Sequence, residues 1–304
     1  MPSRRDIKRR ITSVQNTKKI TKAMEMVAAA RLRRAQQRIE STRPYALRMM
    51  EFITGLAPFI EVDREQFPLL KVHDEVRRVA VVALTADRGL CGAFNANIVR
   101  YAQSLMRGYR EEGIEVDLVV VGKKGVGTFR FQRYALAQTY VGVTDKPTFL
   151  DAQAIANRLA QMYTSGQVDR VVLVFNHFKT AMEQRVEEQV VLPIQEQVVA
   201  QASAGRQAAA PVPAGLPMHL DFLFEPPAEV ILNQLLPSYV EMAVYRALLE
   251  STASEHGSRM TAMRNASESA GEMIDKLTLA MNRARQASIT QEILEVVAGA
   301  DALS

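Results

Sequence analysis

The chain has 304 residues, of which 48% are hydrophobic and 23% charged, so it is long enough for one large soluble domain or two small ones. Aromatic residues make up only 6% and methionines number 14, a composition that suits helix packing better than a β-sandwich. The single cysteine, Cys91, excludes an intrachain disulfide and a cysteine-based metal site. No apolar run approaches the roughly 20 residues of a membrane-spanning helix.

Positive charge is concentrated at the N-terminus. Residues 1–50 contain 14 Lys and Arg but only three acidic residues, whereas the whole chain has a net charge of only +5. The remainder of the chain is therefore acidic. The basic N-terminal segment favours an acidic partner. Composition alone does not decide whether that partner is a nucleic acid, a membrane or a protein. The first residues lack the apolar stretch of a secretory signal.

Residues 1–57 are predicted to form one long coiled-coil helix. Apolar and small residues recur there every three or four positions, at a mean spacing of roughly 3.5 residues. Pro44 is the one breaker and predicts a kink or a local bend. Residues 58–76, with two prolines, are expected to be a linker. The predicted helix seam comprises Ile7, Ile11, Val14, Thr17, Thr21, Met24, Ala28, Leu32, Ala35, Ile39, Thr42, Ala46, Met49 and Ile53.

Residues 77–225 are predicted to form a small α/β domain. Short apolar runs alternate with helical patterns, which is typical of a parallel or mixed sheet covered by helices. Residues 200–217, rich in Ala, Pro and Gly, are expected to be a flexible loop within this domain. The expected strands are 76–84, 116–121, 138–141, 170–176, 185–193 (an edge strand) and 218–224, and the expected helices are 95–112, 123–131 and 149–164.

Residues 226–304 are predicted to form a second long helix. Its stripe of apolar and small residues runs from Leu232 to Ala284, and Ser238 with Glu241 is a candidate capping box. Both terminal helices are too long to stand alone, so we expect them to bury their stripes on each other. The predicted fold class is therefore mixed α+β and α/β: a long antiparallel coiled coil plus a small Rossmann-like α/β domain.

Two glycine-containing segments follow predicted strands. Thr85–Gly92 and Gly122–Thr128 each have the place of a phosphate-binding turn at a helix N-terminus. Neither has the spacing of a dinucleotide fingerprint or a P-loop, so a structural turn is the favoured interpretation. The histidines have no metal-pair spacing, and no catalytic triad is recognisable, so we predict no catalytic, cofactor or metal site. His256 falls on the apolar stripe and is expected to be a packed histidine.

Four segments resemble the gamma subunits of bacterial F-type ATP synthases: residues 10–35, 85–98, 248–270 and 277–303. The resemblance covers nearly the whole chain, and residues 289–302 (ITQEILEVVAGADA) match the family's C-terminal signature pattern. It implies a non-catalytic central-stalk rotor subunit of a proton-translocating ATP synthase. Such a subunit transmits torque between the membrane c-ring and a catalytic hexamer of alternating alpha and beta subunits, with the epsilon subunit beside its α/β domain.

The resemblance also implies where partners are contacted. The basic N-terminal helix, with Arg31, Arg33 and Arg34, is expected to face acidic lever segments that the family's beta subunits carry. The implied location is peripheral, at the cytoplasmic face of a bacterial plasma membrane, and the match begins too near Met1 to leave room for a transit peptide. Residues 264–269 depart from the family's usual Asp-Asn sequence. Rotor–stator contacts are implied at Met24, Arg259, Arg285, Gln286, Thr290 and Glu292.

Two other functions fit part of the sequence. A coiled-coil nucleic-acid-binding protein would use the basic helix and would lose affinity steeply with salt. A dinucleotide-dependent enzyme would bind its cofactor in the central domain. Neither accounts for two long terminal helices around one α/β domain, and the resemblance implies no nucleic acid and no cofactor.

Overall fold

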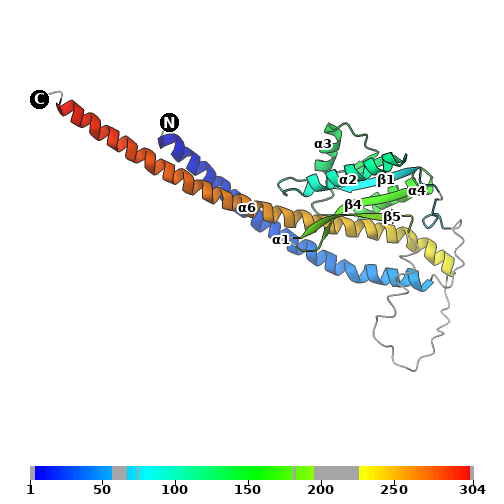
Figure 1. Cartoon of the computed structure of the whole chain (residues 1–304). Coiled ribbons are helices and arrows are strands. Elements are labelled where there is room, and N and C mark those ends of the chain that lie inside the picture. Colours follow the sequence, from blue (N-terminus) through cyan, green and yellow to red (C-terminus); the bar gives the residue numbers. More distant parts are fainter. Residues whose placement is uncertain (1–3, 57–66, 74, 181–182, 195–225, 302–304) are drawn as a thin grey trace, which may run out of the picture. The chain divides into compact units, whose positions relative to one another are not determined.

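The computed structural model describes residues 4–56, 67–73, 75–180, 183–194 and 226–301 (Figure 1). The chain divides into two compact units, one of Met1–Ala30 with Arg259–Ser304 and the other of Arg31–Ser258. Each division falls inside one of the two long helices. The expected loop at 200–217 and strand at 218–224 lie outside the described residues.

Two long helices contribute to both units. Helix α1 comprises Arg4–Leu56, and helix α6 comprises Ala228–Asp301. Each contains one proline, Pro44 in α1 and Pro237 in α6, and each helix continues past it. Among the described helices, none combines the length and the apolar content needed to cross a bilayer.

The predicted capping box at the start of α6 is wrong. Because the helix already begins at Ala228, Ser238 lies inside it, and its hydroxyl donates to the carbonyl of Gln234 at 3.3 Å. The Glu241 carboxylate instead accepts a hydrogen bond from the amide of Gln153 at 3.0 Å. The sequence Pro-Ser-x-x-Glu therefore does not start a helix here. Its serine bonds within α6, and its glutamate makes a tertiary contact.

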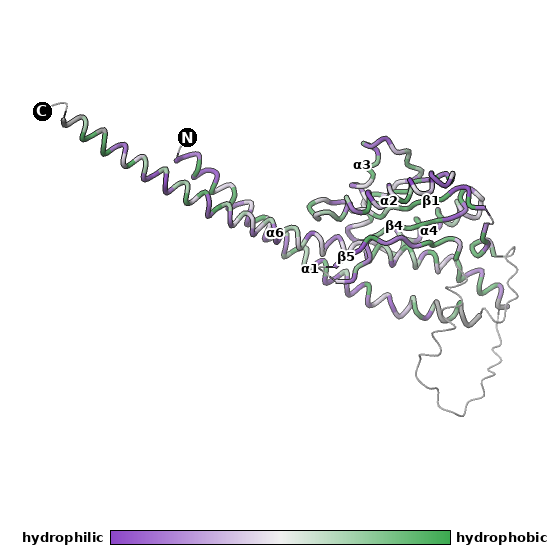
Figure 2. The backbone as a smooth tube through the Cα atoms, in the orientation of Figure 1, coloured by the Kyte–Doolittle hydropathy of each residue, from purple (hydrophilic) through white to green (hydrophobic). Residues whose placement is uncertain are grey.

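Unit 2 is built on a five-stranded sheet of order β3-β2-β1-β4-β5. The first four strands in this order are parallel, and β5 runs antiparallel to β4 as the predicted edge strand. β1 is buried at every position except its first, as expected for a central parallel strand, and it is drawn mostly in green in Figure 2. The strands are β1 (Arg78–Leu84), β2 (Glu115–Val121), β3 (Gln138–Tyr140), β4 (Arg170–Phe178) and β5 (Gln184–Leu192).

Helices cover both faces of the sheet (Figure 1). α2 (Phe94–Glu111) and α3 (Lys123–Phe131) pack on one face. α4 (Phe149–Thr164) packs on the other, together with the parts of α1 and α6 that belong to this unit. α4 begins with a capping box between Thr148 and Asp151. The predicted Rossmann-like domain is therefore present, but α6 is part of its core.

The described part of the segment expected to be a linker, from Phe67 onward, also joins this core. Phe67 is fully buried and Leu69 is 7% exposed, and both belong to the cluster under α4. The Tyr163 hydroxyl donates to the Lys71 carbonyl, and burial, together with the negative charge of Asp169, raises the pKa of Tyr163 to about 12. Residues 67–71 are thus fixed to the domain by apolar burial and one buried hydroxyl.

Unit 1 is an antiparallel helix pair. The Glu25 carboxylate accepts a hydrogen bond from Arg264, and the Lys18 ammonium lies close to Gly271. Residue numbers therefore decrease along α1 in the direction in which they increase along α6. This confirms the predicted antiparallel pairing within the unit. The predicted seam of α1 is buried or half-buried except at Thr17, which is exposed, and Glu25, which the seam did not include, is buried.

Candidate functional site

The loop after β1 is held by one carboxylate. Asp87 accepts hydrogen bonds from the backbone N–H groups of Lys123, Gly142 and Thr144 at 2.9, 2.9 and 3.0 Å. The Thr144 hydroxyl donates to the same carboxylate at 2.8 Å. Asp87 therefore joins the ends of three segments, the loops after β1 and β3 and the start of α3.

The two glycines that follow β2 are required by close packing. The Thr85 hydroxyl donates to the Val121 carbonyl at 2.7 Å and accepts from the Gly125 N–H at 3.0 Å. A Cβ at Gly125 would collide with the Thr85 side chain, and one at Gly122 would collide with the Thr85 carbonyl. Gly122 also has a φ of 98°, which L-residues rarely adopt.

These bonds occupy the groups that a phosphate would use. Burial alone would raise the pKa of the Asp87 carboxyl, but the hydrogen bonds from Gly142, Thr144 and Lys123 outweigh it and lower the pKa. Asp87 is therefore a carboxylate at neutral pH, and its charge lies at the N-terminus of α3, where a phosphate would bind. The predicted structural turn at Thr85–Gly92 is therefore present, whereas residues 123–128 of the second segment belong to the predicted helix, α3.

The ligand crevice of the sheet is also filled. In open parallel sheets, ligands bind at the carboxyl ends of the strands where the strand order reverses, which here is between β1 and β4. The hydroxyls of Ser251 and Ser254 in α6 donate to carbonyls at these two strand ends. All side chains of residues 247–257 in α6 are buried, including the predicted packed histidine, His256.

Of the three arginines on α1 that were expected to contact a partner, one makes its ion pair inside the chain. Arg31 pairs with Asp145 at 2.5 Å, and Arg88 pairs with the other oxygen of the same carboxylate at 3.2 Å. Asp145 thereby joins α1 to the loop after β1. Arg33 and Arg34 are exposed and make none of the ion pairs found among the described residues.

A charged contact lies in the helix pair of unit 1. The Glu25 carboxylate, in a residue only 7% exposed, accepts from Lys22 at 3.0 Å and from Arg264 at 3.2 Å. The hydrogen bond from Lys22 and the one from Arg264 lower the pKa of Glu25, although burial opposes them. Arg264 lies in residues 264–269, the stretch that was expected to depart from the family's usual Asp-Asn sequence.

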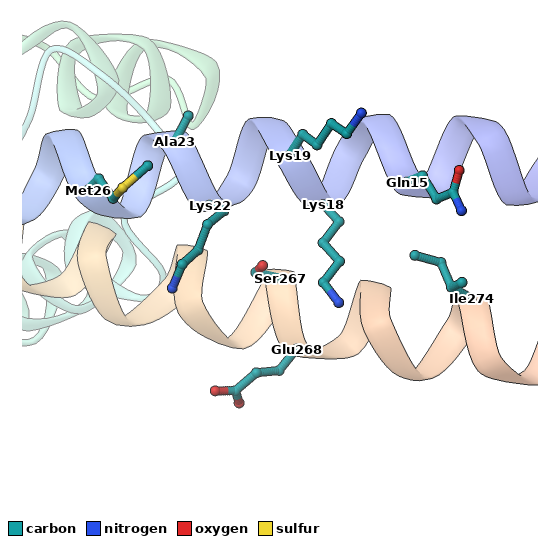
Figure 3. A pocket seen from close by; sticks show the side chains of 9 residues that line it. All are labelled: Gln15, Lys18, Lys19, Lys22, Ala23, Met26, Ser267, Glu268 and Ile274. Atoms are coloured by element: carbon teal, nitrogen blue, oxygen red, sulfur yellow. The ribbon is translucent and has the colours of Figure 1, made fainter.

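A basic groove of about 930 Å³ runs beside this contact (Figure 3). Lys18 and Lys22 extend from α1 toward α6, where Ser267 lies between them, whereas Glu268 points away. Lys19 points away from α6 on the far side of α1. The groove therefore presents the positive charges of Lys18 and Lys22 on either side of Ser267. Its lining residues are Gln15, Lys18, Lys19, Lys22, Ala23, Met26, Ser267, Glu268 and Ile274.

The contact residues implied by the resemblance divide into two groups. Met24 is half-buried, and Arg259 is only 7% exposed, so little of either side chain is available to a partner. The other four lie exposed within about two turns near the end of α6: Arg285, Gln286, Thr290 and Glu292.

The end of α6 also exposes apolar side chains that the sequence analysis did not single out. The register of the helix pair puts Arg4, the first described residue of α1, opposite Arg285. Beyond that point α6 lacks a described partner helix. The exposed fractions are 47% for Ile289, 57% for Ile293, 63% for Leu294, 72% for Val296 and 51% for Val297. The sequence contains a signal for this surface: apolar residues continue beyond Ala284, where the predicted stripe ended.

A family model described as ATP synthase matches residues 3–303. The ATP synthase gamma chain of Heliobacterium modesticaldum is 46% identical over 304 residues, with both chains fully covered. That of Rubrobacter xylanophilus is 43% identical over 304 residues, which cover all of this chain and 99% of the relative. The chain belongs to the ATP synthase gamma chain family.

Solved structures of ATP synthases contain chains that share the fold of this gamma chain family member. A chain in the Tetrahymena thermophila mitochondrial ATP synthase central stalk/c-ring structure is 30% identical, with a TM-score of 0.60 over 82% of this chain and 99% of that chain. A chain in a Euglena gracilis mitochondrial ATP synthase structure, at 19% identity, has a TM-score of 0.68 over 99% and 94% of the two chains. The second likeness concerns the fold alone.

Proposed function

We propose that this chain is the central-stalk rotor subunit of a bacterial, proton-translocating ATP synthase. It passes torque between the membrane c-ring and the alpha/beta hexamer and carries out no chemistry itself. The observation that carries the proposal is the construction of α6, a single helix whose residues 247–257 are buried in the α/β unit and whose residues 285–294 are exposed. Family membership supplies the partners: alpha, beta and epsilon subunits and the c-ring.

The buried part of α6 serves as the root of the shaft. Torque can be passed along a helix only if one end is fixed, and here the root belongs to the core of the α/β unit. The sheet's usual ligand crevice is filled by this root, which supports a non-catalytic role. The chain is proposed to be peripheral, at the cytoplasmic face of the plasma membrane.

The exposed end of α6 serves as the working tip. Five apolar side chains exposed by 47 to 72% would be costly in water, and insertion into a sleeve formed by alpha and beta would bury them. The polar residues Arg285, Gln286, Thr290 and Glu292 share this end and supply directional contacts.

The basic surface of α1 serves as the second contact. Lys18, Lys19, Arg33 and Arg34 are exposed and outnumber nearby acidic residues. We propose that they meet acidic lever segments of the beta subunits as the rotor turns. Such exposed charge contacts weaken with salt, because the Debye length is about 8 Å at physiological ionic strength.

The tip is tested by reconstitution with alpha and beta subunits. We expect Arg285→Ala plus Gln286→Ala to leave the fold intact and to lower coupled ATP synthesis about 30-fold, since two directional contacts of roughly 1 kcal/mol each are lost. A matched control removes the same side chains from exposed positions in unit 2, Arg107→Ala plus Gln167→Ala. Unchanged synthesis in the tip variant would remove the tip contacts from the proposal, and failure of the wild-type chain to restore ATPase activity would contradict the function itself.

A further inference from the structure

Two serines of α6 cap the ends of the two central strands. The Ser251 hydroxyl donates to the carbonyl of Leu84, the last residue of β1, at 3.4 Å. The Ser254 hydroxyl donates to the carbonyl of Asn176 in β4 at 3.2 Å. Both serines are buried, with exposures of 6% and 0%. The two strand ends that border the crevice are thus each bound to the same helix.

A threonine between them binds a third segment. The Thr252 hydroxyl lies 3.1 Å from the carbonyl of Thr144 and 2.7 Å from that of Leu248 in its own helix. Thr144 is the residue whose N–H and hydroxyl donate to Asp87. Thr252 therefore connects α6 to the loop cluster that joins the ends of β1, β2 and β3.

The three hydroxyls point in different directions around the helix. Successive residues of an α-helix are rotated by about 100°, so residues 251, 252 and 254 spread their bonds over about 160° of the circumference. Hydrogen bonds are directional, whereas apolar contacts resist rotation only through shape. Bonds on both sides of the helix axis therefore oppose rotation of α6 in either sense.

Burying these hydroxyls is not needed for packing alone. Alanine or valine would fill the same space without desolvating a polar group, and much of the surrounding cluster is apolar. The partly buried pair His177–Glu250 lies further out and is more open to solvent, with 42% of the histidine side chain exposed. Ser251, Thr252 and Ser254 therefore supply directional bonds that are buried at both partners, unlike the pair that includes His177.

We propose that Ser251, Thr252 and Ser254 form a torsional lock between α6 and the α/β unit. The lock makes the α/β unit and α6 turn together, so that a rotation imposed on that unit enters a helix that continues without interruption to Asp301. The inference rests on the proposed function, because a lock against rotation matters only in a chain that carries torque. It assigns to this crevice a mechanical role in place of ligand binding.

The test uses the complete ATP synthase containing Ser251→Ala, Thr252→Val and Ser254→Ala. A probe is attached to α2 through an Arg107→Cys change, and its angular distribution is recorded while the rotor is stalled. We expect the angular variance to rise about twofold, because buried directional bonds are lost while apolar packing remains. Ion-driven ATP synthesis should fall about threefold, with ATP hydrolysis by detached alpha/beta/gamma complexes unchanged.

The matched control removes the same atoms elsewhere on α6. Ser238→Ala, Ser269→Ala and Thr278→Val alter exposed or partly exposed positions, and the hydroxyls of Ser238 and Thr278 bond only to carbonyls of α6 itself. We expect the control to match the wild type in angular variance and in synthesis. An equal rise in both variants would overturn the lock.

A single-site comparison separates the hydroxyl from packing, in case the triple variant does not fold. Thr252→Ser keeps the hydroxyl and should retain wild-type variance, whereas Thr252→Val keeps the shape and should increase it. Equal behaviour of these two variants would overturn the lock. If the wild-type rotor neither assembles nor rotates, the proposed function has failed; if it rotates and the lock variants are equally stiff, only the lock has failed.

Discussion

Asp87 shows how a single side chain can take the place of a ligand. Its carboxylate accepts from three backbone N–H groups and one hydroxyl, all of which come from other segments of the α/β unit. A phosphate at the N-terminus of α3 would need some of the same N–H groups. The backbone N–H groups of these glycine-containing segments are therefore bonded within the fold.

The Asp87 clamp predicts a pH-dependent contribution to stability. Asp87→Asn replaces an acceptor oxygen with an N–H₂ group facing N–H donors, and we expect it to lower the free energy of unfolding at pH 7 by about 1–2 kcal/mol. Because the folded-state pKa lies below the ordinary 3.8, the contribution is present above that value and is lost as the pH falls through the folded-state pKa. Urea unfolding from pH 7 to pH 3 measures it.

The control for this experiment is Glu112→Gln, which changes an exposed carboxylate in the same unit. We expect it to shift the free energy of unfolding by less than about 0.5 kcal/mol at every pH. A wild-type advantage over Asp87→Asn that stayed constant down to pH 3 would mean that the carboxylate charge is not what stabilises the clamp.

At the scale of elements, α3 combines a local signal with a tertiary requirement. Its bounds, Lys123–Phe131, were predicted from the sequence because they depend on a helical pattern between two strands. The reason for its glycines was not predictable, since it lies in Thr85, about 40 residues away in the chain. The local sequence pattern determines where α3 lies, whereas the distant Thr85 side chain determines that residue 125 must be a glycine.

Two glycines in α3 give a matched pair of variants. Gly125→Ala is expected to destabilise the chain by about 1–3 kcal/mol, because its Cβ meets the buried Thr85 side chain. Gly127→Ala meets nothing within 4 Å and should stabilise it by about 0.4–1 kcal/mol by reducing the freedom of the unfolded chain. Thermal unfolding of both variants checks this, and two shifts of the same sign would refute the packing explanation.

At the scale of the whole molecule, α6 is one helix with two kinds of surroundings. Its root, residues 247–257, is buried on every side, and its tip, residues 285–294, is exposed at every position. Local opening costs least where few side chains are buried. The stability of the helix should therefore change along its length even though its secondary structure does not.

This contrast is measurable by amide hydrogen exchange with peptide-level mass spectrometry. In the isolated chain we expect peptides from 285–294 to exchange near the rate of an unprotected helix end, and peptides from 247–257 to approach the protection of β1. Addition of alpha and beta subunits should protect the tip and leave the root unchanged. Equal protection along α6 in the isolated chain would contradict the two-environment description.

The sequence by itself determined the elements whose signals are local. The helical stripes, the buried strands and their order along the chain follow from periodicity and composition, and the resemblance placed them in the right family. Only the tertiary structure decided that Arg31 is committed to Asp145, that Glu25 is buried beside Arg264, and that three hydroxyls of α6 close the crevice of the sheet. The reason is physical: whether a polar side chain faces water, a partner or its own core depends on donors and acceptors far away in the sequence, and no local pattern records their approach.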